Sequence, residues 1–462
     1  MNMATKKRKG IGHFKIFITM KRLFFIALIA VLLTSCGTGR DRGHLVGVQN
    51  RPSAVYTPPP GMVLIPMGSF IMGPSDQDIA YSHNATSRTI SMSSFYMDET
   101  EITNNQYRQF VYWVRDSIAR KLLAQEAIAI PELERYAILE DDEGFLLDEP
   151  FIRWPRDGGP RNIAWNGEDE REVLEQMFLI EDERFFGRRE IDTRKLLYSY
   201  YTIDLQRAAR DRNIPRQDLI SQHEVAVYPD TLVWIRDFTF SYNEPMTEMY
   251  FWHPTYDHYP VVGVTWPQAK AFNSWRTEYL NSYLASQDQP FAHKFELPSE
   301  AQWEFAARGG LNLSPYPWGG PYMCTEGGCY MANFKPQRGN YALTGGLRPV
   351  IAGHYPPNDY GLYDMAGNVS EWTRTAYDES FYYFMSDMDP DYQYDARDDD
   401  PPSLKRKVIR GGSWKDVGYF LQVSTRSYEY QDTATSYVGF RSVQTFPGHD
   451  RETERRGASN VY

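Results

Sequence analysis

The chain has 462 residues, 42% of them hydrophobic and 15% aromatic, which is enough for one large core or two smaller ones. Its formal net charge of −11 argues against a nucleic-acid-binding surface, because phosphate contacts require a basic patch. No apolar stretch is long enough to predict a stop-transfer helix.

The N-terminus has the pattern of a secretory signal over residues 1–35. Seven basic residues precede the apolar run 23–33, and Cys36 follows shortly after it. This ending resembles the lipobox of bacterial lipoproteins, which implies cleavage before Cys36 and lipidation of that residue. The alternative is an ordinary signal peptide with a cysteine by chance. Met1 and Met20 are both candidate start codons, and Met20 gives a signal of normal length.

The part of the chain after the signal is strongly acidic. Removing residues 1–35 takes away the seven basic residues and no acidic ones, so the formal charge falls from −11 to −18. Residues 36–60 are rich in Gly, Arg and Pro and predict an extended tether. Gly37 stands where an acidic residue retains some lipoproteins at the inner membrane. We therefore expect a lipid anchor in the outer membrane, on its periplasmic face.

The first structured elements are predicted directly after the tether. Residues 62–73 (MVLIPMGSFIMG) predict two strands separated by a Pro–Gly turn. Thr103 is placed to cap a helix whose apolar residues recur at helical spacing, namely Tyr107, Phe110, Val111 and Val114.

Residues 117–259 follow a less regular pattern. They include helical patches at 115–129 and 171–180, a Tyr-rich run at 197–201 and a strand-like run at 231–235 (TLVWI). Their charges alternate in sign, which is typical of a solvated face. We interpret this interval as an insertion that elaborates the domain and offers room for partner contacts.

Two further helices carry clear start signals. Thr265 caps the first, which tolerates Pro267 in its opening turn. Ser299 and Gln302 form a capping box for the second, and Gly309 marks its end. The acidic run 387–402 predicts an additional loop, and residues 446–462 predict a polar tail.

Three glycine-rich segments dominate the C-terminal part: 361–372 (GLYDMAGNVSEW), 408–416 (VIRGGSWKD) and 438–441 (VGFR). Glycine permits unusual backbone conformations, and aromatic residues supply large apolar surfaces, so we expect an α+β domain with little regular secondary structure. Over residues 61–115 and 260–445 the chain resembles the formylglycine-generating enzyme (sulfatase-modifying factor) family. The resemblance implies that family's C-type-lectin-related fold over residues 61–445, with a large insertion at about 117–259.

The sequence departs from the enzymes of that family at two positions. In those enzymes, two cysteines follow the serine of the Gly-Gly-Ser segment by three and eight residues, bind copper and oxidise a substrate cysteine. Here Asp416 and Leu421 occupy these positions. Neither a carboxylate nor a hydrocarbon replaces a thiolate in copper chemistry. We therefore expect no copper, no catalytic residue and no enzymatic activity.

The resemblance also implies a calcium site in the turn at 366–371. Its ligands map to the carbonyl groups of Ala366, Gly367 and Val369 and to the carboxylate of Glu371, and such hard oxygen ligands suit Ca²⁺. The alternative is a turn in which Glu371 only caps or forms an ion pair.

Two smaller constellations remain. Cys324 and Cys329 lie five residues apart in a Gly-rich segment, and in an oxidising compartment the simplest expectation is a disulfide that closes a small loop. Reduced thiols and a redox or copper centre are the alternatives. His253, Asp257 and His258 suggest a metal site, but their spacing does not define a complete ligand set, so we expect structural roles.

The order of segments 62–78, 101–116 and 251–266, together with the lipobox and the missing cysteines, resembles the PorK/GldK family of type IX secretion and gliding-motility lipoproteins. The resemblance implies a non-catalytic subunit of a periplasmic ring. Such a subunit associates with its own copies and with a PorN/GldN-type partner, near a PorG-type outer-membrane protein. Its subunit number is not determined by the sequence.

Three alternatives remain open. GldJ-like gliding lipoproteins share the fold. A divergent periplasmic enzyme would act on protein thiols through Cys324 and Cys329. A saccharide- or peptidoglycan-binding module would use an aromatic-rich cleft, because Trp and Tyr rings can stack on sugars.

Overall fold

The structure, a computed structural model, describes residues 58–74, 86–141, 145–238, 244–336 and 338–448. These residues all belong to one compact unit, Val55–Tyr462. The signal, Cys36, most of the tether and the tail from residue 449 lie outside the described residues.

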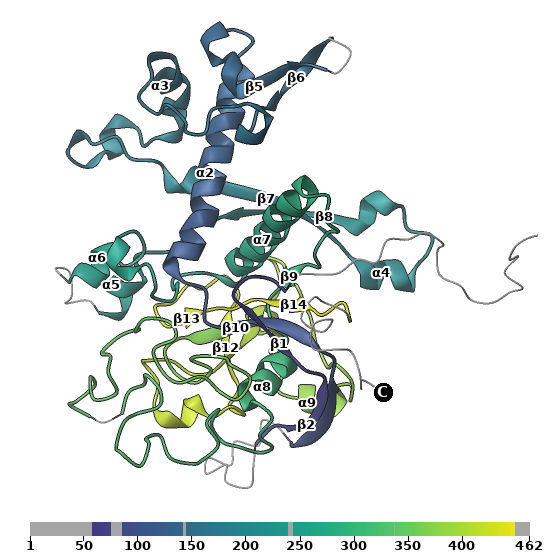
Figure 1. Cartoon of the computed structure of the whole chain (residues 1–462), viewed down its shortest axis with the longest axis vertical. Helices are drawn as coiled ribbons and strands as arrows, with labels where there is room; N and C mark the ends of the chain where they lie inside the picture. The colour runs from purple at the N-terminus through teal and green to yellow at the C-terminus, as the bar shows by residue number, and fades with distance from the viewer. Residues whose placement is uncertain (1–57, 75–85, 142–144, 239–243, 337, 449–462) are drawn as a thin grey trace, which may run out of the picture. The chain divides into compact units, whose positions relative to one another are not determined.

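Two four-stranded sheets form the base of this unit (Figure 1). The first sheet is antiparallel, in the order β1, β4, β14, β9. Its strands are Met62–Ile65, Phe95–Asp98, Val443–Thr445 and Phe295–Glu296. The second sheet has the order β12, β11, β10, β13, and only its β10–β13 pair is parallel. Its strands are Ser427–Tyr430, Arg406–Arg410, Ser370–Ala376 and Val438–Gly439.

Three two-stranded sheets accompany them: β2 with β3, β5 with β6, and β7 with β8. Their strands are Gly68–Met72, Arg88–Met92, Ala137–Glu140, Leu146–Ile152, Leu197–Ile203 and Ile220–Ala226. The two strands predicted in residues 62–73 are therefore confirmed. They do not pair with each other, because β1 joins β4 in one sheet and β2 joins β3 in another.

Three capped helices confirm the sequence signals. They are α2 (Asn104–Glu126), α7 (Trp266–Ser286) and α8 (Glu300–Arg308). Complete capping boxes start them at Thr103, Thr265 and Ser299. Gly309 ends α8 with φ +58°, a conformation that glycine adopts without steric penalty. The shorter helices are α3 (Glu168–Leu174), α4 (Leu205–Arg210), α5 (Val233–Asp237), α6 (Pro245–Met249) and α9 (Phe381–Phe384).

The strand expected at residues 231–235 is wrong. Residues 233–237 form the short helix α5 instead. The Asp230 carboxylate accepts the Leu232 N–H group at 2.8 Å, which favours a turn at this point. Trp234 then packs against Tyr250 and Trp414, so tertiary contacts outweigh the strand preference of Val, Trp and Ile.

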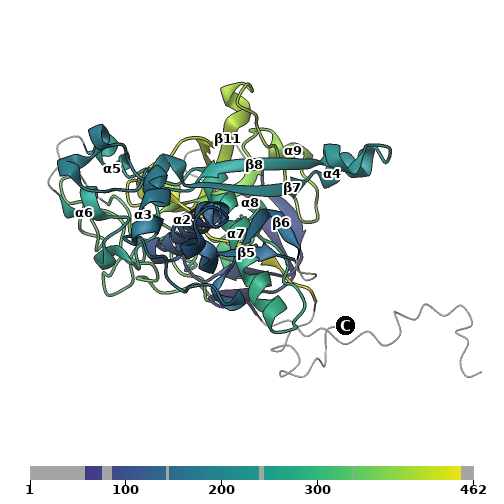
Figure 2. The same ribbon diagram turned by 90° about the horizontal axis from the view of Figure 1, so that it is seen from above.

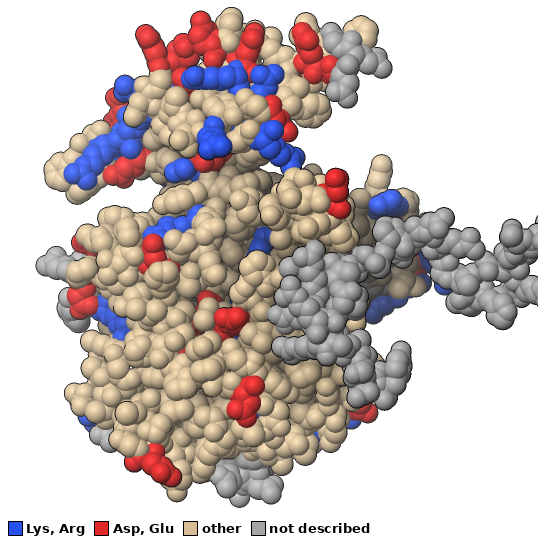
Figure 3. Space-filling model, in the orientation of Figure 1, with Lys and Arg blue, Asp and Glu red and all other residues tan. Residues whose placement is uncertain are grey.

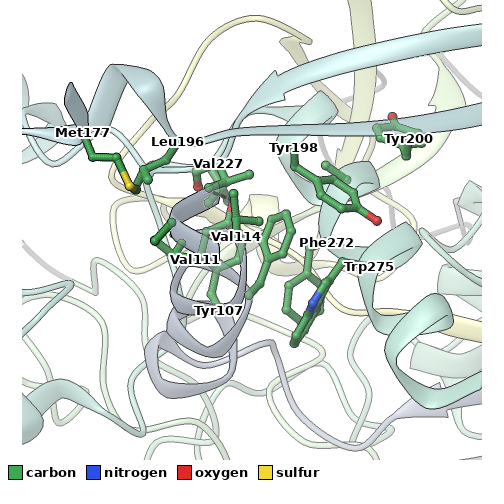
Figure 4. Close-up of a cluster of buried hydrophobic side chains, with 14 of the residues drawn as sticks. Tyr107, Val111, Val114, Met177, Leu196, Tyr198, Tyr200, Val227, Phe272 and Trp275 are labelled. Atoms are coloured by element: carbon green, nitrogen blue, oxygen red, sulfur yellow. Dashed lines mark hydrogen bonds between the residues drawn. The ribbon is translucent and has the colours of Figure 1, made fainter. Parts of the chain in front are cut away.

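The largest core cluster joins α2 and α7 to the interval 117–259 (Figure 4). Tyr107 on α2 stacks on Phe272 of α7, with ring centroids 5.6 Å apart. Phe110 contacts Tyr198 of β7 edge to face, with centroids 5.3 Å apart. The expected boundary at residue 117 falls inside α2, and residues of the interval complete the same core.

The surface of the interval carries both signs of charge close together (Figure 3). Ion pairs link Arg135 to Glu170, and Arg184 and Arg189 to Glu175. This mixture agrees with the solvated face predicted from the alternating sequence. Among the described residues, no helix combines the length and apolar character that a membrane span requires.

Candidate functional site

A cavity of about 160 Å³ lies beside the Gly411–Gly412 turn, which follows β11. Its walls come from the strands β10, β11 and β12 and from the segment after the turn. The lining includes Ser370, Arg410, Gly411, Gly412, Asp416, Phe420, Thr425, Tyr428 and Tyr437.

Both glycines of this turn are required by its geometry. Gly411 and Gly412 have φ angles of +91° and +67°. A Cβ atom on Gly412 would lie 2.7 Å from the Phe420 carbonyl oxygen, and one on Gly411 would lie 3.1 Å from the Trp303 ring. Only glycine fits both the backbone conformation and the close approach of the neighbouring chain.

Asp416 lies in the cavity wall, and its carboxylate is hydrogen-bonded to Ser413 of the same turn. Its carboxylate accepts the Ser413 N–H group at 2.9 Å and the Ser413 hydroxyl at 2.6 Å. Burial raises the pKa of Asp416, and the hydrogen bonds from Ser413 oppose that shift. The carboxylate therefore has a structural role in the Ser413–Asp416 turn.

Leu421 does not line the cavity. Its side chain is fully buried in a separate apolar cluster with Tyr316, Ala332, Phe334 and Ala366. Of the two positions that the resemblance assigns to cysteines, only Asp416 faces the open space.

The turn is covered on one side by the interval 117–259. Trp414 stacks on Trp234 of α5, with ring centroids 6.1 Å apart, and on Phe238 at 5.7 Å. Lys415 forms an ion pair with Asp237 at 2.8 Å. The interval thus contributes directly to the surroundings of the candidate site.

The expected disulfide between Cys324 and Cys329 is not formed. Both thiols are free and exposed. Cys324 forms an antiparallel bridge with Tyr330, and the Thr325 N–H group donates to the Cys329 carbonyl oxygen at 2.8 Å. In this register Cys329 stands opposite Thr325, and successive residues point to opposite faces. The two thiols therefore lie on opposite sides of the small loop.

Glu371 does not fit the calcium site. Its carboxylate is 1% exposed and accepts hydrogen bonds from Arg441 at 2.6, 2.8 and 2.9 Å. The Trp303 indole N–H donates a further bond at 2.7 Å. A carboxylate saturated by a guanidinium group and an indole offers no free oxygen to a cation. This arrangement corresponds to the alternative to a calcium site, in which Glu371 forms an ion pair.

Two further carboxyl groups surround Arg441. Glu101 accepts the Asn368 side-chain amide at 3.0 Å, and Asp364 accepts the Gly353 N–H group at 2.5 Å. Burial is the main cause that raises the pKa of Glu101 well above its ordinary value and that of Asp364 to about 6. Three carboxyl groups thus share one buried guanidinium group.

A second buried network joins α8 to the β11 strand. Arg426 donates to Glu300 at 2.6 and 3.0 Å, and Arg308 donates to Glu304 at 2.6 Å. Arg410 of β11 also pairs with Glu304. The spacing of Glu300 and Glu304 by four positions shows in the sequence that both lie on one face of the helix. Their partners Arg426 and Arg410 are more than 100 positions away along the chain, so the sequence alone did not reveal the pairs.

Two of the remaining candidate residues have structural partners through their side chains. Asp257 pairs with Arg108, and the His253 ring accepts the Thr255 N–H group at 3.2 Å. Across the described residues, no group of three or more His, Cys, Asp or Glu side chains is arranged to hold a metal ion. Cys36 lies outside the described residues, so its lipidation stays a prediction.

The fold and this glycine turn define the class of protein. The family described as the sulfatase-modifying factor enzyme 1-like domain matches residues 48–446. The chain belongs to this family and has its formylglycine-generating-enzyme-like fold, with helices and strands mixed.

Individual relatives differ in activity. The chain is 35% identical over 191 residues to inactive C-alpha-formylglycine-generating enzyme 2 of Bos taurus, covering 40% of this chain and 49% of the relative. It is 25% identical over 402 residues to the formylglycine-generating enzyme of Bos taurus, covering 84% and 76%. The chain spans about half the length of the first of these relatives. Because the family includes both, membership alone does not decide whether this chain is catalytic.

Among solved structures, PvdO from Pseudomonas aeruginosa is similar over 86% of this chain and 99% of its own, with 16% identity and a TM-score of 0.44.

Proposed function

We propose that this protein is a non-catalytic lipoprotein of the outer membrane, and a subunit of the periplasmic ring of the type IX secretion machinery. The observation that carries the non-catalytic part is the pair Asp416 and Leu421. The Asp416 carboxylate accepts hydrogen bonds from Ser413 within its own turn, and the Leu421 side chain is buried in an apolar cluster. The family's chemistry needs two thiolates at these positions, close together in one groove.

The free cysteines do not replace that pair. Cys324 and Cys329 point to opposite faces of their loop, so they cannot clamp one metal ion or form a disulfide without a change of register. The thiol-acting enzyme is therefore disfavoured.

The secretion role rests on the sequence: the lipobox at Cys36, the order of the family segments and the interval 117–259. On this proposal the interval is an insertion that makes contacts with other subunits. Its exposed apolar side chains support that role, since soluble surfaces seldom present such groups in number. They include Phe145, Leu146, Phe151, Phe185 and Phe186. The partners are copies of the same chain, a PorN/GldN-type protein and a PorG-type outer-membrane protein.

The test is the composition, mass and symmetry of the particle extracted from membranes with detergent. We expect a closed ring that contains this chain and a PorN/GldN-type partner, because head-to-tail contacts close when the rotation per subunit divides a full turn. A single copy without partners would contradict the ring. A particle without the PorN/GldN-type partner would favour the GldJ-like alternative.

The Cys36→Ala variant is the matched control for anchoring. It should no longer incorporate a labelled fatty acid or sediment with the outer membrane, because acyl chains are the expected anchor. Incorporation of the label into this variant would refute lipidation at Cys36.

A further inference from the structure

A second cavity, of about 270 Å³, lies between α7, β7 and β9 (Figures 1 and 2). It shares no lining residue with the cavity at the glycine turn. Its walls come from β7, from α7, from the segment 294–297 that contains β9, and from the end of β10 with the loop that follows it. We refer to this cavity as the β7 slot. Pockets for drug-sized molecules measure about 300–1,000 Å³, so the slot suits one small ring.

The charges that line the β7 slot balance. Basic and acidic side chains contribute in equal number, namely Lys270, Lys294 and Arg374 against Glu278, Glu296 and Asp395. Lys270 pairs with Asp395 at 2.8 Å, and Arg374 pairs with Glu296. Within the described part of the chain, Lys294 and Glu278 form no ion pair with each other or with a third residue. A lining without net charge does not favour an ionic ligand, and its ionised groups disfavour an apolar one.

Three side chains of the slot carry polar atoms that no described residue binds. Glu278 accepts the Tyr198 hydroxyl through Oε2 at 2.9 Å, and its Oε1 atom accepts no bond from the described residues. Gln393 donates through Nε2 to Asp391 at 2.6 Å, and its amide oxygen has no donor among the same residues. The Lys294 ammonium group likewise has no partner in the described part of the chain. All three side chains are exposed, so these atoms are open to a ligand.

Tyr201 adds a free aromatic ring to the lining. Its side chain is 66% exposed, and the ring contacts no other ring and no cation among the described residues. The Trp266 ring, by contrast, is contacted by the ammonium groups of Lys270 and Lys407 at 4.3 and 4.1 Å. A free ring can stack on the apolar C–H face of a sugar, so Tyr201 is the available platform in the slot.

These free groups come from different walls of the slot. Glu278 belongs to α7 and Tyr201 to β7, whereas Lys294 belongs to the β9 segment and Gln393 to the loop after β10. A saccharide ring carries hydroxyl groups around its whole rim, and each hydroxyl can both donate and accept. An extended peptide presents its main-chain groups along a line and is recognised through one strand edge and pockets for alternate side chains. The distribution therefore favours a sugar ring over a peptide.

We propose that the β7 slot binds one ring of a neutral saccharide. The sugar stacks on Tyr201, and its hydroxyl groups donate to Glu278 and Gln393 and accept from Lys294. Ligand sites of this kind combine an apolar or aromatic wall with a small number of polar groups that fix the orientation of the ligand. This inference does not depend on the secretion role.

The probes are the neutral trisaccharides chitotriose, maltotriose, cellotriose and mannotriose, titrated into the full chain in a calorimeter. We expect at least one of them to bind. Tyr201→Ala removes the platform and should weaken that binding at least about tenfold, which corresponds to about 1.4 kcal/mol. Tyr201→Phe keeps the ring and should retain the affinity within about threefold. Tyr283→Ala removes a similarly exposed tyrosine of α7 outside the slot and should leave the binding unchanged.

A second variant tests the hydroxyl contacts separately from the platform. Glu278→Gln replaces a charged acceptor at an exposed position and should weaken the binding about three- to tenfold without changing the thermal midpoint. Binding of none of the trisaccharides, or equal binding by the wild type and Tyr201→Ala, would overturn the proposal. Tighter binding of the anionic trigalacturonate than of every neutral probe would contradict a neutral ligand. Selection of peptides from a random octapeptide pool, lost in Tyr201→Ala, would assign the slot to a peptide and would also overturn the proposal.

Discussion

Glu371 is a residue whose expected role, as a calcium ligand, differs from its role in the folded structure, as an ion-pair partner. The turn that contains it resembles a calcium-binding turn, but its carboxylate is bound by Arg441 and Trp303. Both members of the ion pair are almost completely buried. A buried pair of this kind is costly to break, because the remaining charge has neither water nor a partner.

We therefore expect Glu371→Gln to reduce the free energy of unfolding by about 3–5 kcal/mol. Added calcium or a chelator should not change the midpoint of the wild-type protein. Both effects are measured by thermal and denaturant unfolding. Glu296→Gln removes one of the two carboxylate partners of Arg374, at a more exposed position, and should cost about 1 kcal/mol or less. A calcium-dependent rise in the wild-type midpoint, lost in Glu371→Gln, would restore the calcium site.

Asp364 makes stability depend on pH. Burial raises the pKa of this carboxyl group to about 6, and its Oδ1 atom has no partner among the described residues. Arg441, Glu101 and Glu371 are the charged groups that face it. Between about pH 4 and pH 6, the folded chain therefore binds more protons at this site than the unfolded chain. The contribution of Asp364 to stability falls as the pH rises through this range.

Asp364→Asn should remove this loss, because the amide resembles the protonated carboxyl group. From pH 4 to pH 7, the wild-type protein should lose about 2–3 kcal/mol more stability than the variant. Denaturant unfolding at several pH values measures the difference. Asp359→Asn, at an exposed position nearby, is the control and should keep the wild-type profile. Parallel profiles for wild type and Asp364→Asn would contradict the assignment.

At the scale of the element, the Gly411–Gly412 turn is the most constrained part of the candidate site. Gly412 combines a positive φ with the carbonyl group of Phe420 in close approach. Gly412→Ala should lower the free energy of unfolding by about 2–4 kcal/mol through backbone strain and overpacking. Gly327→Ala, where the added methyl group meets only an ordinary contact, should change it by less than about 1 kcal/mol. Equal effects in chemical denaturation would show that the turn tolerates a side chain.

At the scale of the whole molecule, the absence of thiol chemistry at the glycine turn is the sharpest functional expectation. We expect the purified protein, supplied with copper and a cysteine-containing sulfatase peptide, to form no aldehyde, because a carboxylate and a hydrocarbon occupy the two positions. Mass spectrometry of the peptide measures the product, and an active family enzyme run in parallel is the positive control. Asp416→Cys with Leu421→Cys should also be inactive, since residue 421 faces an apolar cluster. Catalytic formation of the aldehyde by the wild-type protein would contradict the non-catalytic assignment and would show that the protein is an enzyme.

The sequence by itself determined the features that depend on neighbouring residues. A capping box involves residues three positions apart, so the amino-acid pattern alone assigns Thr103, Thr265 and Ser299 as helix starts. The paired glycines, the family resemblance and the departure at Asp416 are visible in the same way.

Only the tertiary structure decided which distant residues meet. Glu371 and Arg441 are 70 positions apart, and no local pattern distinguishes a carboxylate paired with arginine from one that binds calcium. Cys324 and Cys329 have the spacing of a small disulfide loop, but the bridge register turns their side chains to opposite faces. Residues 233–237 form a helix because Trp234 is buried against Trp414. Caps and turns follow from hydrogen bonds within a few residues, whereas burial and charge pairing depend on the folded chain as a whole.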